Sequence, residues 1–248
     1  MEQQPVTLLA IESSAGSASC AVLRRENGTE QIVCTAAVNN RLTHSQTLMP
    51  MIHDMLKNAG LSLSNISHLA VAVGPGSFTG IRIGVAAVKG LSFPNDLPCV
   101  GVSTLGGMAR RMEGVPYTGL ILTAMDARCQ QIYTALFSAK NGKIERLTPD
   151  EALPLEEVKK RLTSEKRSIL VIGDGAAITY GALCEAIPNL ILAPESLRYQ
   201  HATGVAIEAL LAVDREECVS GEVLVPAYLR LPQAERELRA KKEKTSQD

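Results

Sequence analysis

The stretch of the chain that is best suited to chemistry is a glycine-rich loop, GPGSFTG, at residues 74–80. It joins an expected buried strand to an expected helix, which brings backbone N–H groups and the positive end of a helix dipole to the edge of a sheet. Such a place can bind an anion. The loop lacks the lysine and hydroxyl of a P-loop and the spacing of a dinucleotide fingerprint. A purely structural tight turn is the alternative. The candidate anion-binding residues are Gly74, Gly76, Ser77 and Thr79.

Two acidic residues stand at strand ends in corresponding places of the two halves of the chain. One expected strand runs into Glu12 and another ends at Asp126. We expect both to face a cleft between the two halves, where they could hold a metal–phosphate group. They could equally accept hydrogen bonds from the amides of the turns that follow, and both interpretations stay open.

The sequence contains no recognisable catalytic constellation. It has no G-x-S-x-G or H-E-x-x-H motif, and its histidines form no ligand pair, so we expect no catalytic residue and no metal site. The cysteines form no C-x-x-C pair, and we interpret them as buried small residues of a cytoplasmic protein. The histidines are His44, His53, His68 and His201, and the cysteines are Cys20, Cys34, Cys99, Cys129, Cys184 and Cys218.

Two expected helices flank the loop, and each has a face that could pack on a partner. In the helix expected at 80–92, small residues follow one another on nearly one side, which lets another backbone approach closely. In the helix expected at 43–58, methionines gather, and methionine is common at adaptable binding surfaces. Packing in the protein's own core is the alternative for both. The small residues are Gly80, Gly84 and Ala87, the polar ones opposite them are Arg82 and Lys89, and the methionines are Met49, Met51 and Met55.

An α/β pattern that occurs twice positions these residues. Each half begins with a three-stranded antiparallel meander and continues with alternating helices and strands. The meanders turn at Asn27-Gly28 and Asn141-Gly142, which are typical hairpin turns. Because the order of elements repeats, we expect two similar lobes with a cleft between them.

The individual elements follow from hydrophobic periodicity and turn residues. For the first helix, Thr43 and Gln46 predict a capping box, Pro50 predicts a kink or the true first turn, and Gly60 predicts the C-cap. The expected strands are 6–13, 18–25, 30–38, 69–73, 98–103, 119–126, 130–139, 143–148, 168–173 and 190–193, and the expected helices are 43–58, 80–92, 104–113, 155–162, 176–186 and 202–213.

Composition narrows the classes of function. The 248 residues are 46% hydrophobic, enough to bury a sizeable core. The net charge of -1 excludes a strongly basic nucleic-acid clamp acting alone, and three Phe, five Tyr and no Trp are too few for a base-stacking platform. Leu69–Val73 is among the longest apolar runs, so we expect no transmembrane helix, and the first residues lack the pattern of a secretory signal.

Motifs spread over most of the chain resemble those of the TsaB (YeaZ) family. The loop and helix at 74–91 closely resemble the family signature and are the most specific match. Glu12 departs from the pattern, which more usually has an aspartate there. The supporting matches are AIESS at 10–14, HSQ at 44–46, GVSTL at 101–105, MDAR at 125–128, GDGA at 173–176 and PAYLR at 226–230.

The resemblance implies an actin/hexokinase/Hsp70-like fold, a duplicated two-lobe α/β architecture of mixed sheets with flanking helices. It divides the chain into an N-terminal lobe at 1–114 with partner-binding helices, a C-terminal lobe at 115–232 and a charged tail at 233–248. It also implies the role of a non-catalytic accessory subunit. The family is similar to the transferase TsaD, which moves threonylcarbamoyl from its adenylate to adenosine 37 of tRNAs that read ANN codons.

The same resemblance implies the partners. Family members form a heterodimer with TsaD through the helices that match 43–58 and 80–92, the ATPase TsaE joins them, and tRNA is reached through the complex. The metal of TsaD is held by an H-x-x-x-H pair. Here those positions are Thr104 and Met108, which are poor substitutes, so we expect no cofactor. The implied partner-binding residues are His44, Leu48, Met51, Met55, Gly80, Arg82, Gly84 and Ala87.

Three other functions are weighed against this one. An ATP-dependent small-molecule kinase of the same superfold would need tight binding of MgATP, and the turn at 12–16 lacks the usual Asp-x-Gly of a first phosphate loop. A metallopeptidase would need paired metal ligands. A self-contained homodimeric scaffold could pair the same two helices isologously.

Overall fold

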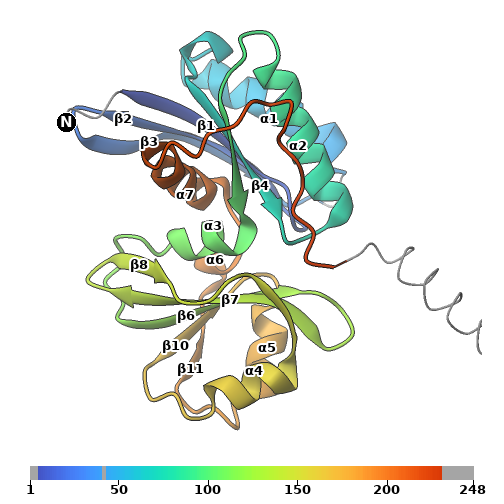
Figure 1. Ribbon diagram of the computed structural model, residues 1–248, viewed down its shortest axis with the longest axis vertical. Helices are drawn as coiled ribbons and strands as arrows, with labels where there is room; N and C mark the ends of the chain where they lie inside the picture. Colours follow the sequence, from blue (N-terminus) through green and yellow to red (C-terminus); the bar gives the residue numbers. More distant parts are fainter. Residues whose placement is uncertain (1–4, 41–42, 231–248) are drawn as a thin grey trace, which may run out of the picture.

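The computed structural model describes residues 5–40 and 43–230. Over this range the chain forms two mixed β-sheets, one in each lobe, with helices against their faces (Figure 1). The expected charged tail at 233–248 lies outside the described residues.

The first sheet has the strand order β3-β2-β1-β4-β5. β1 pairs antiparallel with β2 and parallel with β4, so the meander and the βα part share one sheet. Asn27 and Gly28 have φ of 51° and 74°, as the predicted hairpin turn requires. The strands are β1 (Val6–Glu12), β2 (Ala18–Glu26), β3 (Thr29–Val38), β4 (His68–Gly74) and β5 (Cys99–Ser103).

The second sheet repeats this arrangement. Its order is β11-β10-β6-β7-β8, and β9 also pairs with β7. Taken from β8, the order β8-β7-β6-β10-β11 matches that of the first sheet strand for strand, which confirms the predicted duplication. The strands are β6 (Gly119–Asp126), β7 (Gln131–Lys140), β8 (Lys143–Arg146), β9 (Glu151–Pro154), β10 (Ile169–Ile172) and β11 (Leu190–Leu192).

The helices lie close to the predicted ranges, with two additions: the short helix α6 and a 3-10 turn. In the described part of the chain, no helix is both long and apolar enough to cross a bilayer. The helices are α1 (His44–Asn58), the 3-10 turn (Leu63–Asn65), α2 (Phe78–Ser92), α3 (Thr104–Arg110), α4 (Leu155–Leu162), α5 (Ala176–Leu183), α6 (Glu195–Arg198) and α7 (Ala202–Asp214).

Successive side chains of β1 are buried on opposite faces of the first sheet. Leu9 and Ile11 pack in the core under α1 and α2, whereas Leu8 and Ala10 pack in the core under α7. Because both faces are covered, the strand is an almost continuous apolar run rather than an alternating one.

The chain passes between the lobes more than once, so the contiguous boundary predicted between 1–114 and 115–232 needs a correction. α7 packs on β1, β2 and β5 of the first sheet, although it falls in the range assigned to the second lobe. The segment after α7 also returns, since Val219 forms a bridge with Cys99 of β5. The first lobe is therefore built from both ends of the described chain.

The start of α1 differs from the prediction. Thr43 is the N-cap, but its side chain binds no backbone amide, so the predicted capping box with Gln46 is not formed. Its hydroxyl oxygen instead lies 3.1 Å from Ser45 Oγ. Pro50 lies inside the helix and not in its first turn. Gly60 follows the helix with φ of 66°, as a C-terminal glycine commonly does.

Candidate functional site

A cleft of about 500 Å³ lies between the two lobes. Its walls come from the β1–β2 turn (residues 13–17), the loop before α2, the end of β6 and the last residues that the structure describes. The cleft predicted from the duplication is therefore present, and the glycine-rich loop contributes to it. The lining side chains include those of Ser14, Thr79, Asp126, Tyr133, Asp174 and Arg230.

The glycine-rich loop packs against the protein's own backbone. Gly74 and Gly76 have φ of 134° and 155°, and a Cβ on either would overlap a carbonyl oxygen of another segment. Ser77 Oγ accepts a hydrogen bond from Gly80 N and so caps α2. These contacts support the tight-turn interpretation. Ser77 and Thr79 are exposed beside the cleft, and anion binding by the loop stays a prediction.

The two strand-end acids accept hydrogen bonds from turn amides, which was one of the two interpretations. Asp126 lines the cleft and accepts from Arg128 N at 2.7 Å. Glu12 is 1% exposed, accepts from Ser14 N at 2.6 Å and is not part of the cleft lining, so the expectation that it faces the cleft is wrong. Burial raises the pKa of the Glu12 carboxyl to about 7, and the charge of Asp174 adds to the rise.

The two positions that the resemblance matches to the H-x-x-x-H pair lie in α3. Thr104 and Met108 are buried, with 0% and 2% of their surface exposed, and neither lines the cleft. Over the described residues, no group of three or more His, Cys, Asp or Glu side chains is placed to hold a metal ion.

α1 uses part of its predicted partner surface for its own packing. Leu48 and Met55 are 1% and 6% exposed and belong to the core under α1 and α2. For these two residues the predicted partner contact is corrected to a core contact, because the helical period places them on the inner face. Met51 is partly buried, whereas Met49 is 45% exposed.

Two of the small residues of α2 let another segment approach closely, but it is the chain's own β1–β2 turn. A Cβ on Gly80 would overlap the carbonyl oxygen of Ser13, and a Cβ on Gly84 would overlap Ser13 Oγ. Ser13 Oγ also donates to Gly80 O at 2.9 Å. From α1, His44 Nε2 lies 2.7 Å from the carbonyl oxygen of Ala15. Gly80 and Gly84 therefore hold this turn against α2 and do not face a partner, which corrects the prediction for both.

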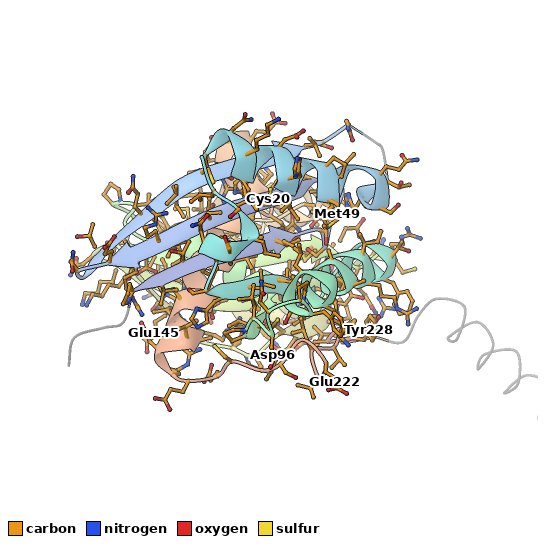
Figure 2. All side chains as sticks on the ribbon, turned by 90° about the horizontal axis from the view of Figure 1, so that it is seen from above. Cys20, Met49, Asp96, Glu145, Glu222 and Tyr228 are labelled. Atoms are coloured by element: carbon orange, nitrogen blue, oxygen red, sulfur yellow. The ribbon has the colours of Figure 1, made fainter. Side chains whose placement is uncertain are left out.

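The remaining predicted residues stay at least partly exposed on the two helices. α1 and α2 lie side by side at the top of the first lobe in Figure 1, and Figure 2 looks down on them, with Met49 labelled on α1. We call this surface the α1–α2 face. It is defined by His44, Met49, Met51, Arg82 and Ala87.

Arg82 is held on this face by an aromatic pair that the sequence reasoning missed. Its guanidinium carbon lies 3.8 Å from the centroid of the Phe78 ring, and its Nε donates to Tyr228 OH at 2.8 Å. The rings of Phe78 and Tyr228 stack, with centroids 4.8 Å apart. Tyr228 follows Arg82 by 146 residues, so no local pattern links the two; the only signal was the motif PAYLR.

Comparison with known proteins matches this two-lobe architecture to one class. The family model described as TsaD, tRNA N6-adenosine threonylcarbamoyltransferase, matches residues 39–238. The transferase of that name from Ruegeria sp. is 30% identical over 171 residues, which are 60% of this chain and 47% of the relative. Fold and match together define a protein of the TsaD-like class, with a duplicated actin-like fold.

Within this class, two relatives that match along nearly the whole chain are named TsaB and YeaZ. The tRNA threonylcarbamoyladenosine biosynthesis protein TsaB of Bacillus subtilis is 32% identical over 231 residues, which are 93% of this chain and 96% of the relative. The structure of YeaZ from Pseudomonas aeruginosa superposes with a TM-score of 0.73 at 29% identity, covering 90% of this chain and 100% of that one. The chain belongs to the TsaB (YeaZ) family, which confirms the resemblance and the fold class expected from the sequence.

Proposed function

We propose that this chain is a non-catalytic accessory subunit in the formation of N6-threonylcarbamoyladenosine at position 37 of ANN-decoding tRNAs. In this role it binds and supports the transferase TsaD in the cytoplasm. The ATPase TsaE is a further member of the complex, and tRNA is bound by the complex as a whole. Membership of the TsaB family is the observation that carries the proposal.

Two buried positions in α3 support the non-catalytic part of the proposal. The chain shares the TsaD family model, yet the two positions of the H-x-x-x-H pair hold a threonine and a methionine that are enclosed in the core. A neutral hydroxyl and a soft thioether do not replace two imidazole ligands. We infer that this chain keeps the fold of the transferase without its metal site.

The α1–α2 face supports the partner-binding part. It combines methionine side chains with an exposed arginine in a fixed orientation, and both residue types are enriched at protein interfaces. The buried residues Leu48, Met55, Gly80 and Gly84 contribute to this face from the inside, because they fix the two helices to the sheet and to the β1–β2 turn.

Light scattering after size exclusion tests the proposal directly. We expect the chain mixed with TsaD of the same organism to form a 1:1 species or a larger assembly of both. Threonylcarbamoyl transfer to tRNA by TsaD, TsaE and ATP should then depend on adding this chain. Unchanged profiles at micromolar concentrations would contradict the accessory role.

Replacing Arg82 with alanine should weaken binding to TsaD about tenfold, since arginines that become buried when a complex forms are frequent hot spots of interfaces. Calorimetric titration of the purified proteins measures this change. Arg215→Ala is the control, because Arg215 is exposed beyond α7 and pairs with Glu217. Equal affinities of the Arg82 and Arg215 variants would place the interface elsewhere.

Nucleotide binding distinguishes the kinase alternative from the proposed function. The β1–β2 turn directs carbonyl oxygens of Ser13, Ser14 and Ala15 at α1 and α2, where they serve internal packing. We expect no measurable heat when MgATP is titrated into the chain. Saturable binding of MgATP would favour the kinase. In the light-scattering experiment, a stable homodimer that does not bind TsaD would favour the homodimeric scaffold.

A further inference from the structure

Residues 219–230, which we call the C-terminal strap, run along α2 from its end back to its beginning (Figure 1, orange to red). Val219 pairs with Cys99 of β5 through two backbone hydrogen bonds of 2.8 Å. Further along, Ala227 N donates to Val73 O at 2.8 Å. The strap is therefore anchored to the backbone of the first lobe at both of these points.

Side chains fix the strap to α2 between and beyond these anchors. Lys89 Nζ donates to the carbonyl oxygen of Glu222 at 3.0 Å. Leu224 is buried in the core under α1 and α2 with 4% of its surface exposed. At the N-terminal end of α2, the Tyr228 hydroxyl accepts the hydrogen bond from Arg82 Nε. Figure 2 labels Glu222 and Tyr228, two residues of the strap.

The last contact of the strap is made with the other lobe. Arg230 Nη1 donates to the carbonyl oxygen of Ala127, directly after β6, at 3.0 Å. Residues 227–230 line the cleft together with Ala127 and Arg128. The chain itself joins the lobes at α3 and between α6 and α7, and the strap adds a noncovalent tie at the cleft.

We propose that the C-terminal strap is a latch that couples partner binding on the α1–α2 face to closure of the inter-lobe cleft. Tyr228 holds Arg82 on the partner side, and Arg230, two residues later, holds the second lobe. Because both contacts lie on one short segment, loosening one of them loosens the other. The inference rests on the proposed function, since it concerns regulation of the same partner face.

The guanidinium of Arg82 indicates which chemical group of the partner binds there. Its Nε is used by Tyr228, and among the described residues its two terminal nitrogens have no hydrogen-bond partner. A guanidinium with a fixed plane and a free edge binds a carboxylate through two parallel hydrogen bonds. The partner group is therefore an acidic side chain, and it binds best while Tyr228 holds the guanidinium plane, that is, in the latched state.

Hydrogen exchange of the full-length chain, measured by mass spectrometry without any partner, tests the latch. Arg230→Ala removes the tie to the second lobe, Tyr228→Phe removes only a hydroxyl, and Val225→Ala is the control at a position that is 65% exposed. We expect the amides of residues 126–131 to exchange about fivefold faster in the first two variants and unchanged in the control. No difference from the control would overturn the latch. A uniform rise that includes β10 and β11 would overturn it too, because a latch acts locally.

Adding TsaD of the same organism tests the coupling. We expect binding to slow exchange in both the strap and residues 126–131, and Tyr228→Phe to lower the affinity about threefold. Equal affinities together with unchanged exchange at 126–131 would overturn the coupling. If the native chain does not bind TsaD at all, the proposed function fails, whereas the exchange data on the isolated chain still decide the latch.

Discussion

Replacing Gly80 with alanine should lower the free energy of unfolding by about 3 kcal/mol. The added methyl group would overlap the carbonyl oxygen of Ser13, which belongs to the backbone and cannot rotate away. Either α2 or the β1–β2 turn must then shift, together with the hydrogen bond from Ser13 Oγ to Gly80 O. Urea denaturation followed by circular dichroism measures the change.

Gly90 provides a matched control in the same helix. No atom lies within 4 Å of a Cβ added there, so Gly90→Ala should stabilise the protein by about 0.5–1 kcal/mol through helix propensity alone. The two glycine variants should therefore differ in sign. A Gly80→Ala protein as stable as the native one would contradict the close approach of the turn. A bulky substitution at Gly80 or Gly84 would therefore disturb the fold itself, and a change in partner binding would follow from that disturbance.

Replacing Glu12 with glutamine should remove a pH dependence of stability. The pKa of the Glu12 carboxyl is about 7 in the folded protein and 4.5 by its ordinary value, so the unfolded chain loses this proton first as the pH rises. The folded state then binds more protons between these values, and stability falls by about 3 kcal/mol from pH 4.5 to 7 before it levels off. Glu12→Gln, neutral at every pH, should lack this fall.

Unfolding free energies at half-unit steps from pH 4.5 to 8 measure the difference between the native and variant proteins. Glu145→Gln is the control, because Glu145 lies exposed on β8 (Figure 2). The Glu145 variant should follow the native curve. Parallel curves for the native and Glu12 variants would show that the buried carboxyl ionises as it does in the unfolded chain.

Features of the fold that depend on residues close together in the sequence were predictable. The hairpin at Asn27-Gly28 and the buried strands follow from turn chemistry and apolar runs, and the repeat of the element order predicted two lobes. The place of α7 was not predictable, because its apolar face fits either sheet and only the tertiary fold selects the first one. β9 was missed because its four residues, EALP, form neither an apolar run like that of β10 nor a segment marked by a hairpin turn like β8.

The candidate site was also predictable only in part. The spacing of Gly80 and Gly84 indicated a close approach of another backbone; at Gly80 that backbone is the chain's own, and at Gly84 only side chains approach. Spacing does not say whose backbone approaches. The same holds for Leu48 and Met55, since a helix face that packs on its own sheet has the same period as one that packs on a partner. The role of Tyr228 could not be predicted from the sequence, because its contact with Arg82 forms only when residues 219–230 return to α2.

Synthesis on the ribosome exposes a sheet face that the finished protein buries. When residues 1–114 have emerged, the side of the first sheet that carries Leu8, Ala10 and Val102 still lacks its covering helix, α7. The roughly 100 residues in between take about 5–20 s to translate at 5–20 residues per second. The first lobe to be made is thus the last to be completed, and an apolar surface stays open to chaperones or to aggregation during that time.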